Sequence, residues 1–301
     1  MSPTSSDRVL DGAPLASRTV LAPASLIALA LSFLLAAPIA AASPTPTVNP
    51  GTMAGPGAAD QPALSALQSD GLTIFAAASL ADVLEDLETT WLDESPQVPL
   101  TIAFDASNVL AAQITEGADV DVFLSADLSR PAGLAEAGFT SGEPVTFAQN
   151  SPVIVVPLDS QAVMTAMDLA EPGIRLVAAG TSVPITRYAE EAIAQLAATT
   201  PDPAAFSSAV AANVVSREDN VRAALAKVEL GEGDAAIVYA TDAHASDAVR
   251  EVPFPEAVQV SAEYGAVQVS DDPAAAAFVI WLTGPTAQAV LANAAFRPAD
   301  G

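Results

Sequence analysis

The chain has 301 residues, 36 of them acidic and 10 basic, which gives a formal net charge of −26 at neutral pH. Nucleic acid and anionic membrane surfaces are therefore excluded as partners, because Lys and Arg bind phosphate backbones. The sequence has no cysteine, so we predict no disulfide, thiol nucleophile, cysteine-ligated zinc or lipidated cysteine. Its length allows one large domain or two lobes of ordinary size.

The first 71 residues have the composition of an export signal followed by a linker. Within residues 1–42, basic residues precede an apolar segment, and Ala40-Ala41-Ala42 forms an A-x-A cleavage site. Residues 21–42 are also long enough to span a bilayer, so an uncleaved anchor is the alternative. Residues 43–71 are rich in Pro and Gly and predict a disordered linker. We expect an exported, non-lipidated protein in the periplasm or on the outer face of the cell membrane.

From Leu72 onward, strand and helix patterns alternate along the chain. Strands are predicted at 72–77, 98–104, 120–124, 151–157, 174–179, 211–215, 235–239, 258–261 and 264–269. Helices are predicted from 79 to about 91, and at 107–116, 130–137, 160–169, 186–198, 220–229, 273–282 and 286–293, with a helical turn near 241. This alternation predicts an α/β fold whose mainly parallel sheets carry helices on both faces.

Two serines stand where a predicted strand runs into a helix. Ser79 follows the first strand and precedes Asp82 by three residues, which is the pattern of a helix-capping serine. Ser107 occupies the equivalent place after the second strand. The carboxyl ends of neighbouring parallel strands meet at one sheet edge, where α/β proteins bind ligands. We expect both hydroxyls to reach that edge.

Three further junctions in the second half carry similar chemistry. Residues 180–186 open one helix, residues 218–222 open another, and Tyr239 ends a strand. A helix N-terminus offers free N–H groups to an anion, and hydroxyl groups add further donors. The sequence therefore predicts a site for a tetrahedral oxyanion held between two lobes.

Several short motifs, in this order, resemble those of the molybdate-binding proteins that serve molybdenum ABC transporters. The resemblance covers residues 72–296, nearly all of the chain past the linker. The motifs are Phe75-Ala76-Ala77-Ala78-Ser79-Leu80, Gly117-Ala118-Asp119-Val120-Asp121-Val122-Phe123-Leu124-Ser125-Ala126-Asp127, Val183-Pro184 before a helix, and Ile237-Val238-Tyr239.

The resemblance implies the two-lobed fold of periplasmic binding proteins, with a ligand cleft between the lobes. Residues 72–151 and 263–301 would form lobe I, and residues 152–262 would form lobe II. The resemblance also implies a monomer that needs no cofactor, is not an enzyme and delivers molybdate to a membrane permease. Its five implied ligand-binding residues are Ser79 and Ser107 through their hydroxyls, Ile185 and Val221 through backbone N–H groups, and Tyr239 through its phenol.

Four charged residues near these positions need separate interpretation. Asp121 matches an acidic position of the family pattern and is interpreted as structural. Asp105 would repel a fully ionised oxyanion if it faced the ligand, and would instead suit a protonated one such as hydrogen phosphate. The alternative is that Asp105 caps its own turn. Arg187 and Arg222 would lend positive potential to the cleft, but outward-facing arginines are common on helices.

Other functions remain open at the level of sequence. Tungstate, sulfate or phosphate are alternative ligands. A secreted hydrolase using Ser79 or Ser107 would need His244, the only histidine, as its base. A third alternative is an envelope protein that keeps the fold without transport. Trp91 and Trp281 stand at helical core spacing and are expected to pack rather than bind.

Overall fold

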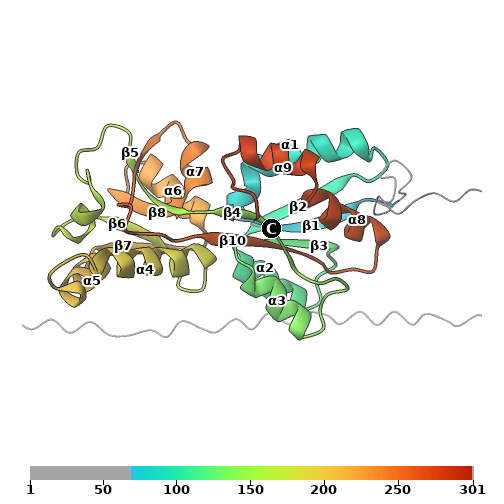
Figure 1. The fold of residues 1–301 in the computed structure, drawn as a ribbon, viewed down its shortest axis with the longest axis horizontal. Coiled ribbons are helices and arrows are strands. Elements are labelled where there is room, and N and C mark those ends of the chain that lie inside the picture. The colour runs from blue at the N-terminus through green and yellow to red at the C-terminus, as the bar shows by residue number, and fades with distance from the viewer. Residues whose placement is uncertain (1–68, 300–301) are drawn as a thin grey trace, which may run out of the picture. The chain divides into compact units, whose positions relative to one another are not determined.

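The computed structural model describes residues 69–299, which lie in one compact unit of the chain, residues 58–301. The predicted export signal and all but the last three residues of the predicted linker lie outside the described residues. Within 69–299, the strands form two five-stranded sheets, each with helices on both faces (Figure 1). We call the sheet that contains β1 and its helices lobe I, and the other sheet and its helices lobe II.

Lobe I has the strand order β2-β1-β3-β10-β4. Its strands are β1 (Leu72–Ala77), β2 (Leu100–Asp105), β3 (Val122–Ser125), β4 (Val145–Asn150) and β10 (Ala262–Gln268). Helices α1 (Ala81–Glu94) and α9 (Pro285–Asn293) pack together on one side with α8 (Pro273–Leu282), and α2 (Ser107–Thr115) and α3 (Ser129–Glu136) lie on the other (Figure 1). Both tryptophans pack as predicted, since Trp91 makes edge contacts with Phe278 and Trp281.

Lobe II has the strand order β7-β6-β8-β5-β9. Its strands are β5 (Pro152–Pro157), β6 (Leu176–Ala179), β7 (Val214–Glu218), β8 (Ala235–Tyr239) and β9 (Val249–Val252). Helices α4 (Pro184–Ala197) and α5 (Pro203–Ala212) lie on one side, and α6 (Val221–Glu229) and α7 (Ala240–His244) on the other (Figure 1). The chain crosses between the lobes at Ser151 and again between β9 and β10.

The two-lobed α/β architecture is confirmed, but the sheets are mixed rather than mainly parallel. In lobe I, β1 runs parallel to β2 and β3, whereas β10 runs antiparallel to β3 and β4. In lobe II, β6 runs parallel to β7 and β8, whereas β5 runs antiparallel to β8 and β9. The antiparallel strands are those next to the crossings. A chain that enters a sheet from the other lobe has no crossover helix to return it in the parallel sense.

Several predicted elements need correction. The predicted helix 160–169 is a short 3₁₀ turn, η3 (Ala166–Ala170), because the Asp168 carboxylate accepts the N–H groups of Met164 and Thr165 and fixes a loop. The predicted strand 258–261 is not a strand. Strands β4 and β9 and helix α5 were not predicted from the sequence. Helix α5 consists mainly of small residues, which leave no apolar stripe at helical spacing.

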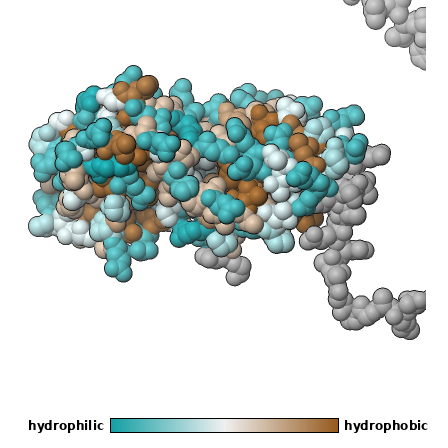
Figure 2. All heavy atoms as spheres, turned by 90° about the horizontal axis from the view of Figure 1, so that it is seen from above, coloured by the Kyte–Doolittle hydropathy of each residue, from teal (hydrophilic) through white to brown (hydrophobic). Residues whose placement is uncertain are grey.

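The described surface is largely polar, as the acidic composition suggests. Figure 2 shows one face, on which hydrophilic residues separate groups of hydrophobic ones. The large apolar side chains that are exposed come from several elements of both lobes: Phe104, Phe139, Leu158, Met164, Met167, Val215, Leu230 and Ile280. Among residues 69–299, no single helix is long and apolar enough to cross a membrane, although α8 and α9 together, bent by 56°, pass on length and composition alone.

Candidate functional site

All five predicted ligand-binding residues line one cavity between the lobes. Its walls come from the ends of β1, β3 and β8 and the N-terminal ends of α2, α4 and α6. The lining residues are Ala77, Ala78, Ser79, Ala106, Ser107, Ala126, Val183, Pro184, Ile185, Asn220, Val221 and Tyr239, none of which carries a charge. The cavity is small, with a volume of about 10 Å³.

The two serines reach the cavity, but neither caps a helix with its side chain. Ser79 lies in a 3₁₀ turn, η2 (Ala78–Leu80), and α1 begins only at Ala81, without a side-chain cap. The predicted capping role of Ser79 is therefore wrong. Its hydroxyl instead forms a 2.9 Å hydrogen bond with the phenol of Tyr264. Ser107 is the first residue of α2, and its Oγ accepts the N–H of Ala126 at 3.0 Å. That bond leaves the Ser107 hydrogen available to a ligand.

Ile185 and Val221 occupy the first turns of their helices. Helix α4 begins at Pro184, so Ile185 is its second residue, and Val221 is the first residue of α6. N–H groups in a first turn have no acceptor within the helix, and the positive end of the helix dipole lies there. Asn220 caps α6 by accepting the N–H of Ala223 at 3.0 Å. The cap leaves the Val221 N–H free for another acceptor.

Tyr239 supplies a phenol from the end of β8. Its hydroxyl donates to the carbonyl of Ala126 in lobe I over a long 3.4 Å. Burial, together with the neighbouring phenol of Tyr264, raises the pKa of Tyr239 well above its usual range. The phenol therefore keeps its proton at neutral pH and acts as a donor. An anion in the cavity would be a stronger acceptor than the distant carbonyl.

The charged residues singled out from the sequence lie outside this cavity. Asp105 accepts the N–H of the following residue, Ala106, at 2.7 Å, as the turn-capping alternative predicts. Asp121 is structural, because its carboxylate accepts from the Thr73 N–H at 2.8 Å and the Ser270 hydroxyl at 2.6 Å. Arg187 folds back over the ring of Tyr188.

Arg222 joins the two lobes through a pair of carboxylates. It lies in lobe II and forms ion pairs with Asp82 on α1 of lobe I and, at 2.9 Å, with Asp242 on α7. Although burial opposes its charge, the two carboxylates raise the pKa of Arg222. Asp242 is completely buried and also accepts the N–H of Tyr239 at 3.1 Å. Arg222 is thus next to Val221 and fastens the lobes beside the cavity.

Asp242 should make the protein more stable in mild acid. Burial raises the pKa of Asp242 to about 7, against the pull of Arg222. The folded state then binds a proton more readily than the unfolded state between about pH 4 and about pH 7, so the free energy of unfolding rises as the pH falls through that range. At about 1.4 kcal/mol per pKa unit, the contribution is on the order of 1–4 kcal/mol.

The measurement is urea unfolding across that pH range for the wild type and Asp242→Asn. The variant should lose this part of the pH dependence. Asp86→Asn, which changes an exposed carboxylate on α1, is the matched control and should follow the wild type. Parallel curves for the wild type and Asp242→Asn would contradict the prediction.

His244 does not form a catalytic pair with either serine. It is exposed on α7 and borders a separate interlobe cavity of about 180 Å³, which Ser79 also lines. Among the described residues, no hydrogen bond joins His244 to Ser79 or Ser107, and the Ser79 hydroxyl is engaged by Tyr264. The geometry required of a serine nucleophile and its base is therefore not present.

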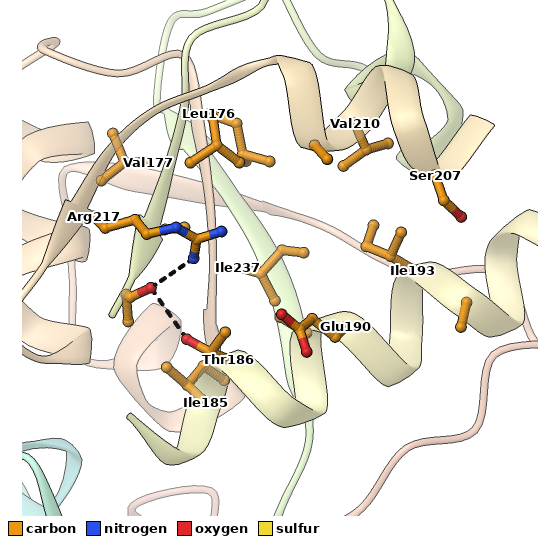
Figure 3. A pocket seen from close by; sticks show the side chains of 16 residues that line it. Leu176, Val177, Ile185, Thr186, Glu190, Ile193, Ser207, Val210, Arg217 and Ile237 are labelled. Carbon is orange, nitrogen blue, oxygen red and sulfur yellow. Dashed lines mark hydrogen bonds between the residues drawn. The ribbon is translucent and has the colours of Figure 1, made fainter. Parts of the chain in front are cut away.

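A larger apolar pocket lies within lobe II, behind the first turns of α4. It has a volume of about 300 Å³ and lies between α4, α5 and the strands β6 and β7 (Figure 3). Arg217 and Thr186 both donate to the carbonyl of Ala179 at its edge, at 3.1 and 3.2 Å. Ile185 lines this pocket as well as the interlobe cavity. The side chain of Ile185 therefore packs against apolar neighbours, as expected for a residue that would contribute only its backbone N–H to the site.

Three residues that hold the site together were not predicted from the sequence. Ala126 supplies the N–H to Ser107 and the carbonyl to Tyr239. Tyr264 and Asn150 form buried hydrogen bonds to each other and toward Ser79. Asn150 ends β4 just before the first crossing, and Tyr264 follows the second. Both residues lie beside a crossing between the lobes. That position could have pointed to them, but only once the lobe boundaries were known.

A cavity that lies between two lobes and is lined by neutral hydrogen-bond donors is the arrangement of a protein that holds a small ligand between its lobes. The family model described as bacterial extracellular solute-binding protein matches residues 72–297, and the chain belongs to this family. The expectation from the sequence motifs is confirmed at this level.

Individual relatives agree with the family assignment. The molybdate-binding protein ModA of Mycobacterium tuberculosis H37Rv is 32% identical over 246 residues, covering 79% of this chain and 88% of the relative. The periplasmic molybdate-binding protein of Azotobacter vinelandii matches with a TM-score of 0.66 at 22% identity, over 76% of this chain and all of that one. The sulfate-binding protein SubI of M. tuberculosis has the same TM-score at 21% identity, over 76% of this chain and 87% of that one. The fold alone therefore does not choose between these anions.

Proposed function

We propose that this protein captures molybdate outside the cytoplasm, in the cavity between its lobes, and delivers it to an ABC permease. The observation that carries the proposal is the composition of the cavity: hydroxyl and backbone donors from both lobes, without a charged side chain. Molybdate is fully ionised at neutral pH and needs donors only. Fixed donors in a dry site bind a dianion well, because their dipoles are already oriented before the ligand arrives.

The five donors would act together on one tetrahedral anion. Ser79 and Ser107 from lobe I and the Val221 N–H and Tyr239 phenol from lobe II would each contact an oxygen, with Ile185 adding a further N–H. Because the donors come from both lobes, binding would favour the closed arrangement. The closed form would then be recognised by the permease. No cofactor and no covalent step are involved.

Molybdate is preferred to sulfate and phosphate for two reasons. The 32% identical relative is a molybdate-binding protein, whereas the likeness to a sulfate-binding protein rests on fold. Hydrogen phosphate would need an acceptor in the site, and Asp105 does not line the cavity. Tungstate is nearly equal to molybdate in size and charge, and we expect it to bind as well.

Calorimetric titration of the exported form with molybdate, tungstate, sulfate and phosphate tests this proposal. We expect molybdate and tungstate to bind more tightly than sulfate, and phosphate to bind weakest. Heat from phosphate under conditions where molybdate gives none would overturn the assignment.

Loss of a single hydroxyl should weaken binding measurably. Ser107→Ala removes one buried donor, which should cost about 1–3 kcal/mol of molybdate binding, or roughly 5- to 150-fold in Kd. Ser141→Ala, an exposed serine outside the cavity, is the matched control. Equal affinity of the two variants would show that the site lies elsewhere.

A further inference from the structure

A buried chain of hydrogen bonds runs from the crossing between the lobes to Ser79. The Nδ2 of Asn150 lies 3.4 Å from the phenol oxygen of Tyr264, and that oxygen lies 2.9 Å from the Ser79 Oγ. Asn150, Tyr264 and Ser79 are 1%, 0% and 3% exposed, so water does not compete for these bonds. Only Ser79 of the three lines the candidate site.

The orientation of the Asn150 side chain is fixed by its other bonds. Its Oδ1 accepts the backbone N–H of Ser151 at 2.9 Å, and its Nδ2 donates to the Thr241 hydroxyl at 2.8 Å. A side-chain amide nitrogen has two hydrogens and cannot accept. The second hydrogen therefore points toward Tyr264, whose oxygen is the acceptor.

This assignment sets the direction of the next bond. Burial raises the pKa of Tyr264 well above its usual range, so the phenol keeps its one hydrogen. Because its oxygen already accepts from Asn150, Tyr264 donates that hydrogen to Ser79. The Ser79 Oγ then accepts within the protein, and its own hydrogen is left to point into the cavity. Ser107 likewise accepts a hydrogen bond within the protein, in its case from the N–H of Ala126, so that its hydrogen also remains for the ligand.

We propose that Asn150 and Tyr264 are positioning residues that commit the hydrogen of Ser79 to the ligand, so that the site favours fully ionised oxyanions over those carrying a proton. This inference rests on the proposed oxyanion-binding function. A fully ionised oxyanion meets hydrogens throughout the cavity. Hydrogen phosphate brings a hydrogen of its own, and the Ser79 oxygen, which already accepts from Tyr264, has only one lone pair left to receive it. The selectivity is set at the crossing between the lobes, away from the ligand.

The experiment compares molybdate and hydrogen phosphate at alkaline pH, where phosphate is chiefly the monohydrogen dianion. The two ligands then carry the same charge, so their affinity ratio reports on hydrogen-bond direction and not on charge. Sulfate, which matches phosphate in size, is titrated beside them. In Tyr264→Phe, the Ser79 hydroxyl is free to turn. We expect the preference for molybdate over hydrogen phosphate to fall by about 10-fold, and that for sulfate over hydrogen phosphate to fall similarly.

Asn150→Asp reverses the chain without changing its shape. A carboxylate cannot donate, so Tyr264 would turn its hydrogen toward it and Ser79 would donate to Tyr264. Ser79 would then present lone pairs to the cavity, and the preference for molybdate should fall further than in Tyr264→Phe. The added negative charge weakens both dianions alike and cancels in the ratio. This variant also carries the test if Tyr264→Phe does not fold, as judged by circular dichroism and urea unfolding.

Two further variants separate positioning from general structural damage. In a Ser79→Ala background, Tyr264→Phe should leave the ratio unchanged, because no hydroxyl remains to be turned. Tyr188→Phe removes the hydroxyl of another buried tyrosine and should keep the wild-type ratio. Wild-type ratios in both Tyr264→Phe and Asn150→Asp, with tight molybdate binding retained, would overturn this inference and leave the proposed function standing. Absence of molybdate binding by the wild type would overturn both.

Discussion

Val221→Pro should weaken molybdate binding by about 10- to 100-fold while the protein stays folded. The substitution removes the backbone N–H that we propose contacts the anion, and a hydrogen bond to a charged group contributes about 1.5–3 kcal/mol. Proline is well tolerated as the first residue of a helix. In this chain α4, α5, α8 and α9 all begin with proline.

The local backbone is suited to this change. Asn220, the residue before, is extended at φ −151° and ψ 175°, which is the conformation that a following proline favours. Its side-chain cap to Ala223 does not involve the Val221 N–H. Calorimetric titration gives the affinity, and Val221→Ala measures the separate effect of shortening the buried side chain. If the proline variant binds no more weakly than the alanine variant, the Val221 N–H is not a ligand.

The site residues could be predicted from the sequence because the features that mark them are local. Ser79, Ser107 and Val221 each stand where a strand or loop leads into a helix, and such junctions are defined by residues close in sequence. The five predicted positions therefore meet in one cavity once the lobes form. The α/β class likewise followed from alternating apolar patterns, whereas the two lobes were implied by the family resemblance of the motifs.

Contacts between residues that are far apart in the chain could not be predicted from the sequence. The capping pattern of Ser79 and Asp82 is local, yet both side chains are taken by distant residues: Ser79 by Tyr264 and Asp82 by Arg222. The antiparallel direction of β5 and β10 was missed for the same reason, since strand direction depends on where the chain crosses between lobes. Asn150 and Tyr264 are 114 residues apart. No pattern in a single sequence pairs them.

The second large effect is expected at Arg222. In Arg222→Met, Asp242 stays completely buried without its cation, and removing one partner of a buried ion pair costs about 3–5 kcal/mol. The loss should be measured by urea unfolding above about pH 7, where Asp242 is ionised. It should shrink in mild acid, because a protonated Asp242 no longer needs the guanidinium. Asp242→Asn in the same chain should restore much of the lost stability at neutral pH.

The two ion pairs of Arg222 should separate stability from closure. Asp82 is a half-exposed partner on the other lobe, so Asp82→Asn should change the free energy of unfolding by only about 0.2–1 kcal/mol. It should nevertheless weaken molybdate binding, because the ion pair between Arg222 and Asp82 is made only when the lobes are together. Arg222→Met would show both effects, and Asp242→Asn in that background would rescue stability but not affinity. Recovery of full affinity in the double variant would mean that the interlobe ion pair does not contribute to closure.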